Sequence, residues 1–191
     1  MSLTFSATDW EAMYAPYDQS TYQAVLALLK PQDIVLDIGA GNLQFSRRMA
    51  QVTSKVYAVE VNASLLQQGL DSSTALPDNL IPIPADARKL DVPTGISVGV
   101  LLMRHCTHFR YYSTKLRLAG VERLITNARW RMNVEEVNLQ GEGTSFNNTA
   151  MGWYACSCGA TGFKTGPIEQ WSSEMDQETH EVIDCPQCRQ N

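Results

Sequence analysis

Short apolar runs alternate with stretches of helical periodicity along the first two thirds of the chain. The sequence predicts a strand in each of five runs rich in apolar residues, at residues 34–38, 56–59, 80–83, 96–103 and 123–126. Between these runs, apolar residues recur at helical spacing, as in the stripe of Tyr22, Val25, Leu26 and Leu29 and in that of Phe45, Met49 and Val52. Unbroken apolar runs are typical of strands covered on both faces. The pattern therefore predicts an α/β, Rossmann-like fold, with a mainly parallel sheet and helices on both faces.

A turn with two glycines follows the first predicted strand and precedes a helix. It reads Asp37-Ile38-Gly39-Ala40-Gly41. Glycine permits positive φ and lets a ligand approach the backbone, and the start of a helix favours an electron-rich group. Such a turn can also simply join a strand to a helix. The dinucleotide pattern G-x-G-x-x-G is absent, which makes a nicotinamide-dependent oxidoreductase the weakest interpretation.

Two more carboxylates follow predicted strands. Glu60 ends the second strand, nineteen residues after Gly41, where a carboxylate can accept both hydroxyls of a ribose. Asp86 follows the third strand and can accept a hydrogen bond from an adenine amino group. Each acid taken alone can equally cap a helix or face solvent.

Together, the Asp37–Gly41 motif, Glu60 and Asp86 resemble the class I S-adenosylmethionine-dependent methyltransferases, over about residues 18–127. The resemblance implies that S-adenosylmethionine binds with its methionine portion near Asp37 and its ribose on Glu60. It adds neighbouring residues to the cofactor site: Gly39, Ala40, Gly41, Val61, Ala87 and Met103. The sequence departs from the family pattern in having Leu43 at the third glycine position. Only residues 134–139 are left to supply the final antiparallel strands, so we expect a shortened sheet.

The methyl acceptor is expected near the carboxyl end of the fourth strand. His105 is the candidate catalytic base there, with His108 as a second candidate, since a histidine pKa near 6.5 suits proton transfer at neutral pH. Both can equally cap the strand or bond to backbone. Cys106 could be a nucleophile, but no pattern supports this. No acceptor-specific motif follows the strand, so a small molecule, RNA or protein remains open.

Basic and aromatic residues gather in residues 104–131. The basic ones are Arg104, Arg110, Lys115, Arg117, Arg123, Arg129 and Arg131. Such a stretch can hold phosphates and stack on bases. It can also be a solvated helix face, or it can pair with the acidic C-terminal part of the same chain.

The C-terminal part contains two close cysteine pairs. Four thiolates, from Cys156, Cys158, Cys185 and Cys188, suit a tetrahedral zinc ion, although the first pair has one intervening residue where two are usual. Disulfides or unligated thiols are the alternative. A complete set of four ligands predicts a structural zinc ion. We divide the chain into a methyltransferase-like domain, residues 1–148, and a zinc-ribbon-like module, residues 149–191.

Charge and composition limit the partners and the cellular location that we expect for this protein. The 191 residues carry a formal net charge of −5, which disfavours a surface that coats nucleic acid. No apolar run reaches membrane length and the N-terminus does not resemble a signal peptide, so we expect a cytoplasmic protein without a membrane partner. The acidic zinc module favours a protein partner over nucleic acid. The leading hypothesis is a methyltransferase of unknown acceptor. The alternative is a non-catalytic S-adenosylmethionine-binding adaptor or sensor.

Overall fold

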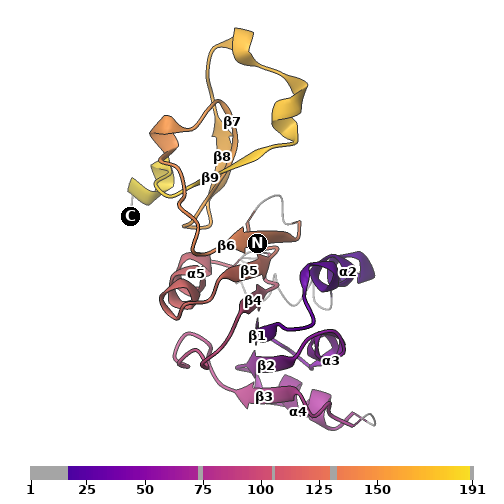
Figure 1. Ribbon diagram of the computed structural model, residues 1–191. Coiled ribbons are helices and arrows are strands. Elements are labelled where there is room, and N and C mark those ends of the chain that lie inside the picture. Colours follow the sequence, from indigo (N-terminus) through magenta and orange to yellow (C-terminus); the bar gives the residue numbers. More distant parts are fainter. Residues whose placement is uncertain (1–16, 73–74, 105, 130–132, 190–191) are drawn as a thin grey trace, which may run out of the picture.

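The computed structural model describes residues 17–72, 75–104, 106–129 and 133–189. These residues form two sheets, one of six strands and one of three. The six-stranded sheet and its helices form one unit, and the three-stranded sheet stands beside the edge strand β6 (Figure 1).

The larger sheet has the strand order β3-β2-β1-β4-β5-β6. Its five parallel strands are β1 (Ile34–Ile38), β2 (Lys55–Glu60), β3 (Leu80–Pro84), β4 (Val98–Leu101) and β5 (Arg123–Thr126). The last strand, β6 (Glu135–Asn138), runs antiparallel to β5. The predicted α/β fold and the shortened sheet are thereby confirmed, and β3 lies at an edge, where its two prolines remove few ladder donors.

Helices cover both faces of this sheet. On one face lie α2 (Gln19–Leu28), α3 (Gln44–Ala50) and α4 (Ala63–Leu70), and on the other lies α5 (Phe109–Leu118) (Figure 1). Each face has its own apolar cluster, one built around Val25 and Met49 and the other around Phe109 and Leu116. Asp18 caps α2 by accepting a bond from the Thr21 N–H, and Asn62 caps α4 by accepting from the Ser64 and Leu65 N–H groups.

The fourth strand is shorter than predicted. The sequence predicts residues 96–103, whereas β4 spans Val98–Leu101. Ile96 is buried but lies between the turn at residues 94–95 and the start of the ladder, where Val98 pairs with Val35. Apolar burial and strand pairing are different properties, and the periodicity alone does not separate them.

The smaller sheet has the order β8-β7-β9, with β7 (Gly152–Cys156), β8 (Thr161–Lys164) and β9 (Thr179–Val182). Four 3-10 helices accompany it: η2 (Phe146–Asn148), η3 (Ile168–Gln170), η4 (Ser173–Asp176) and η5 (Pro186–Arg189). The polar, glycine-containing stretch 141–148, which precedes the predicted boundary, contacts this sheet. Thr144 pairs with Val182, and Asp184 accepts bonds from Ser145 and Phe146. The boundary near residue 148 stays a prediction.

Within the described parts of the chain, no helix has the length and apolar character needed to cross a membrane.

Candidate cofactor site and metal centre

The glycine turn lies at the carboxyl end of β1, in the middle of the sheet. Gly39 and Gly41 have φ of +81° and +56°, in the region that favours glycine. The N–H groups of Gly39 and Ala40 both donate to the Val59 carbonyl, at 2.9 and 3.0 Å. A Cβ on Gly39 would lie 2.5 Å from Cε of Met103, so Met103 packs directly against the turn. The turn is therefore fixed between β2 and the end of β4.

Leu43, which replaces the third glycine of the fuller motif, also adopts a left-handed conformation, with φ of +63°. Its side chain is fully buried in the cluster on the α3 face. A non-glycine residue in this conformation is strained by about 1–2 kcal/mol. The burial of a leucine side chain, worth about 1.5–3 kcal/mol, offsets this strain.

Glu60 joins the glycine turn to the start of α4. One carboxylate oxygen accepts from the Gly41 N–H at 2.8 Å and the other from the Asn62 N–H at 2.7 Å. The residue is 7% exposed. Because each carboxylate oxygen can accept two hydrogen bonds, each keeps room for one hydroxyl donor. Val61, the next residue, is 70% exposed.

Asp37 is buried at the end of β1 and accepts a hydrogen bond from the Ser46 hydroxyl at 2.6 Å. Burial raises the pKa of Asp37 from 3.8 to about 6; the Ser46 bond opposes the rise and the nearby Glu60 charge adds to it. A buried carboxylate with so high a pKa gains from any cationic group placed beside it.

Asp86 lies near the end of β3 but is held by Arg88. The Arg88 guanidinium contacts both Asp86 oxygens, at 2.8 to 3.2 Å, and reaches His108 Nε2 at 3.1 Å. These hydrogen bonds lower the pKa of Asp86 to about 2. Because Ala85 donates to the Glu60 carbonyl, Asp86 and Ala87 lie on the loop beside the end of β2. The structure thus brings the predicted residues together on three neighbouring strand ends.

The methyl acceptor is predicted near the carboxyl end of β4, and two histidines are its candidate bases. His105, the predicted catalytic residue, lies outside the described residues. His108 precedes α5, and its Nε2 accepts from Arg88 in the tautomer that carries the proton on Nδ1.

Asn127, which the sequence analysis missed, follows β5 at the same edge and is 0% exposed. Neither amide atom of Asn127 has a hydrogen-bond partner within the described part of the chain. Its position directly after a buried strand was the one sequence feature that could have indicated a site residue here.

Most of the described basic residues in 104–131 are engaged inside the protein. Arg123 pairs with Asp33 and Glu136, and Lys115 donates to the carbonyls of Ala87 and Arg88. Arg110 and Arg117 on α5 are exposed. Arg131 lies outside the described residues.

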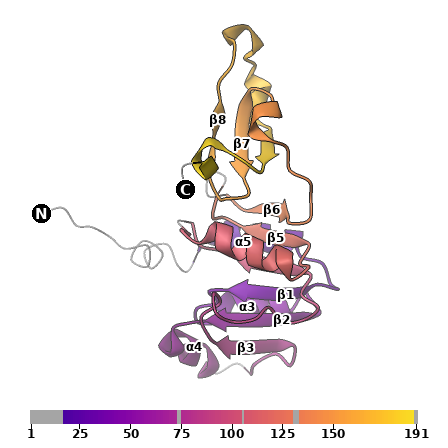
Figure 2. The same cartoon turned by 90° about the vertical axis from the view of Figure 1, so that its left-hand side faces the viewer.

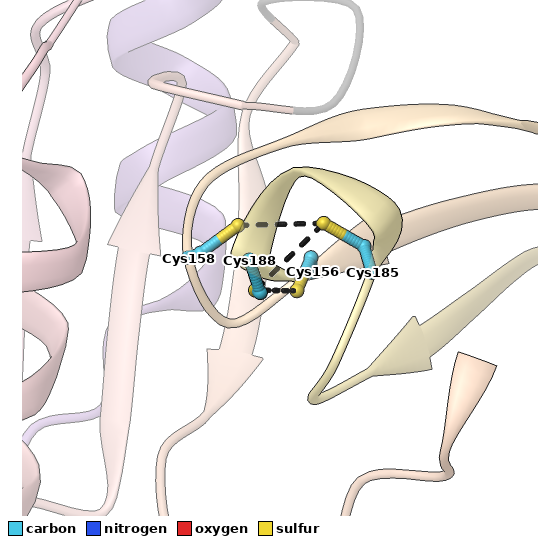
Figure 3. A group of neighbouring side chains, drawn as sticks. All are labelled: Cys156, Cys158, Cys185 and Cys188. Carbon is cyan, nitrogen blue, oxygen red and sulfur yellow. Dashed lines mark hydrogen bonds between the residues drawn. The ribbon is translucent and has the colours of Figure 1, made fainter. Parts of the chain in front are cut away.

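The four predicted zinc ligands converge at one end of the small sheet (Figure 3). All four sulfur atoms lie within 4.8 Å of one another. Three pairs, 156–188, 158–185 and 185–188, are 3.5, 3.6 and 3.8 Å apart. With zinc–sulfur bonds of about 2.3 Å, the edge of a tetrahedron is roughly 3.8 Å. None of these cysteines is in a disulfide. The donor set and its spacing fit zinc.

Arg129 connects this cysteine cluster to the larger unit. Its side chain is 0% exposed and pairs with Glu135 of β6 and with Glu181 of β9. It also donates to the Cys156 carbonyl at 3.2 Å. Burial alone would lower the pKa of Arg129, but the two carboxylates raise it above its ordinary value. Of the basic stretch, Arg129 therefore pairs with the acidic C-terminal part of its own chain.

Comparisons with known proteins give partial matches. No protein-family model matches the chain. It is 39% identical over 69 residues to the "Probable ribosomal RNA small subunit methyltransferase A" of Methanosarcina acetivorans, a match to 36% of this chain and 25% of that protein. The protein of the same name from Methanosarcina mazei is 42% identical over 67 residues, 35% of this chain and 24% of its own. The chain thus spans about a quarter of the curated relatives it matches.

Among solved structures, the 23S rRNA methyltransferase ErmE superimposes with a TM-score of 0.51, at 18% identity, over 58% of this chain and 46% of that one. At this identity the likeness concerns the fold. The six-stranded unit therefore has the Rossmann-like fold of a methyltransferase.

Proposed function

We propose that this chain binds S-adenosylmethionine and transfers its methyl group. The observation that carries the proposal is the Glu60 carboxylate, buried between the Gly41 and Asn62 N–H groups with one acceptor position left on each oxygen. This geometry suits the two adjacent hydroxyls of a ribose. S-adenosylmethionine, when bound, supplies a methyl group on a positively charged sulfur atom.

The other residues then have separate roles in holding the cofactor. Asp37 and the backbone of Gly39, Ala40 and Gly41 face the methionine portion, where the buried carboxylate favours a cation. Val61 covers one face of the adenine, while Asp86 and Ala87 lie at its edge and Met103 lies next to the glycine turn. Asp86 must share its carboxylate between Arg88 and the adenine amino group.

Calorimetric titration of the zinc-loaded protein with S-adenosylmethionine tests this assignment, with NAD as a control ligand. We expect micromolar binding of the first and none of the second. Glu60→Gln should weaken binding by about tenfold or more, because a charged acceptor gives the stronger hydrogen bonds. Glu122→Gln is the matched control, because Glu122 is an exposed carboxylate just before the amino end of β5, whereas the glycine turn follows the carboxyl end of β1. Equal affinity in both variants would rule out Glu60 as the ribose ligand.

For the acceptor, we propose a base in RNA. The curated relatives named above are described as ribosomal RNA methyltransferases, and this likeness supports the proposal. Two exposed arginines on α5, Arg110 and Arg117, are available for phosphates. His105 is the proposed base, and the Asn127 amide can both donate to and accept from a planar acceptor.

Tritiated-methyl transfer to unmodified small-subunit ribosomal RNA, compared with transfer to a mixture of proteins, tests the acceptor. We expect label in the RNA alone. Asn127→Leu should lower transfer at least tenfold and leave the calorimetric affinity for S-adenosylmethionine unchanged. Label in protein would refute RNA as the acceptor. Cofactor binding without transfer to either substrate would favour the alternative, an S-adenosylmethionine-binding adaptor.

We also propose that the four cysteines bind one structural zinc ion. The spacing of the sulfur atoms supports this proposal, and four protein ligands leave no coordination position open for a substrate. Metal analysis of the purified chain should give one zinc per molecule. Cys106→Ser is the control that leaves the count unchanged, because Cys106 is not part of the cluster.

A further inference from the structure

The loop between β8 and β9 forms a projection that neither the cofactor site nor the metal site explains. We call residues 165–178 the tip. The tip lies at the end of the small sheet farthest from the six-stranded unit (Figures 1 and 2). Residues 165–171 are all exposed, and Ile168 and Trp171 are exposed by 78% and 58%. A large apolar pair in this position is typical of a contact surface rather than of a core.

Local hydrogen bonds form short 3-10 turns within the tip. The 3-10 helix η3 has N–H bonds from Gln170 to Pro167 and from Trp171 to Ile168, at 3.0 and 3.1 Å. Beyond it, the Trp153 indole N–H donates to Asp176 at 2.7 Å and fixes η4 against β7. The backbone N–H of Trp171 thus closes a formed turn, and a preformed turn lowers the entropic cost of binding.

The tip carries negative charge around these apolar side chains. It contains Glu169, Glu174, Asp176 and Glu178 and no Lys or Arg, a formal charge of −4. Neither Glu169 nor Glu174 has an ion-pair partner among the residues that the structure describes. The neighbouring Lys164 is turned away, because its ammonium donates to the carbonyls of Phe146, Asn147 and Thr149.

We propose that the tip is a docking surface for a basic, arginine-containing segment of another protein. A guanidinium can stack on the exposed face of Trp171 while it pairs with Glu169 or Glu174. Exposed tryptophans of this kind carry much of the binding energy where an interface forms. RNA is repelled by the same carboxylates. The proposal does not depend on the methyltransferase assignment, because the tip is remote from the glycine turn.

A labelled peptide of alternating arginine and leucine, titrated with the full zinc-loaded chain and followed by fluorescence anisotropy, tests the proposal. Trp171→Ala and the double variant Glu169→Gln, Glu174→Gln should each weaken peptide binding by about tenfold or more. Higher salt should weaken binding to the parent chain, but much less to the double variant. Leu118→Ala removes a side chain that is 75% exposed on α5 and serves as the matched control, with binding unchanged. Zinc content and circular dichroism should be the same in all four proteins.

Three results would overturn the proposal. The first is peptide binding that does not change in Trp171→Ala, which would indicate general attraction to an acidic chain. The second is binding of a labelled single-stranded RNA that Trp171→Ala abolishes, which would make the tip a nucleic-acid surface. The third is concentration-dependent self-association, measured by analytical ultracentrifugation, that disappears in Trp171→Ala, because the occupant would then be a second copy.

Discussion

The two sheets of this protein are stabilised in different ways. The six-stranded unit buries an apolar cluster on each face, with residues such as Val98, Leu101 and Ile125 at 0% exposure. The buried cluster of the small sheet has four members, Tyr154, Cys156, Val182 and Cys185, and two of these are the proposed metal ligands. We therefore expect apolar burial to maintain the first unit, and the proposed zinc ion to supply much of the folding free energy of the small sheet.

The largest expected effect is the unfolding of the small sheet when the proposed zinc ion is removed. Structural zinc contributes on the order of 10 kcal/mol of folding free energy in small zinc domains. Chelation, or Cys185→Ser, should abolish hydrogen-exchange protection in β7 and β9 and leave protection in β1 and β4 unchanged. Cys106→Ser, outside the cluster, should change neither. Persistent protection of β7 after chelation would contradict the difference between the two units.

Arg129 tests how strongly the two units are joined. Arg129→Leu removes the guanidinium that pairs with Glu135 and Glu181. Because the Glu181 side chain is 51% exposed and water can solvate its carboxylate, we expect the free energy of unfolding to fall by about 2–3 kcal/mol. Urea unfolding measures this loss, and limited proteolysis should show earlier cleavage near residue 148. Arg117→Leu, at an exposed position on α5, should cost less than about 0.5 kcal/mol. Similar losses in the two variants would mean that Arg129 does not join the units.

Asp37 tests how much a buried negative charge lowers the free energy of unfolding of the six-stranded unit. Its pKa is about 6 in the folded chain and near 3.8 when unfolded, so folding takes up a proton between these values. Stability conferred by the protonated form is thus lost as the pH rises from about 4 to above 6. At neutral pH, Asp37→Asn should therefore be more stable than the parent by up to roughly 3 kcal/mol.

Urea unfolding at several pH values measures this difference, which should vanish near pH 4. Asp71→Asn, which changes an exposed carboxylate at the end of α4, should show no such trend. A stability difference for Asp37→Asn that is independent of pH would argue against a raised pKa. The same variant should bind S-adenosylmethionine more weakly, which separates the stability of the unit from its proposed function.

The smallest effect distinguishes two glycines of similar backbone conformation within the first unit. Gly39 and Gly120 have φ of +81° and +80°, but an added Cβ meets Met103 only at Gly39. Alanine at either position should cost about 1–2 kcal/mol in thermal or urea unfolding. Only Gly39→Ala should also reduce the affinity for S-adenosylmethionine. Equal affinity of both variants would show that the turn does not contact the cofactor.

Local sequence determined the framework of the larger unit. The bounds of β1 and β5 could be predicted to the residue, because apolar runs of this length, rich in β-branched residues, form buried strands. The proximity of Asp37, Glu60 and Asp86 also followed, since the carboxyl ends of neighbouring parallel strands meet at one edge. The spacing of the cysteine pairs predicted their convergence in the same way.

Tertiary structure decided which polar side chains form ion pairs and hydrogen bonds within the protein. No local pattern shows that Arg129 pairs with Glu181, 52 residues away, or that Arg88 occupies the Asp86 carboxylate. The burial of Asn127 and the exposure of Trp171 likewise depend on which segments pack over them. Periodicity reports the face on which a side chain lies. Its partners depend on contacts between segments that are distant in sequence, and only the folded chain brings these together.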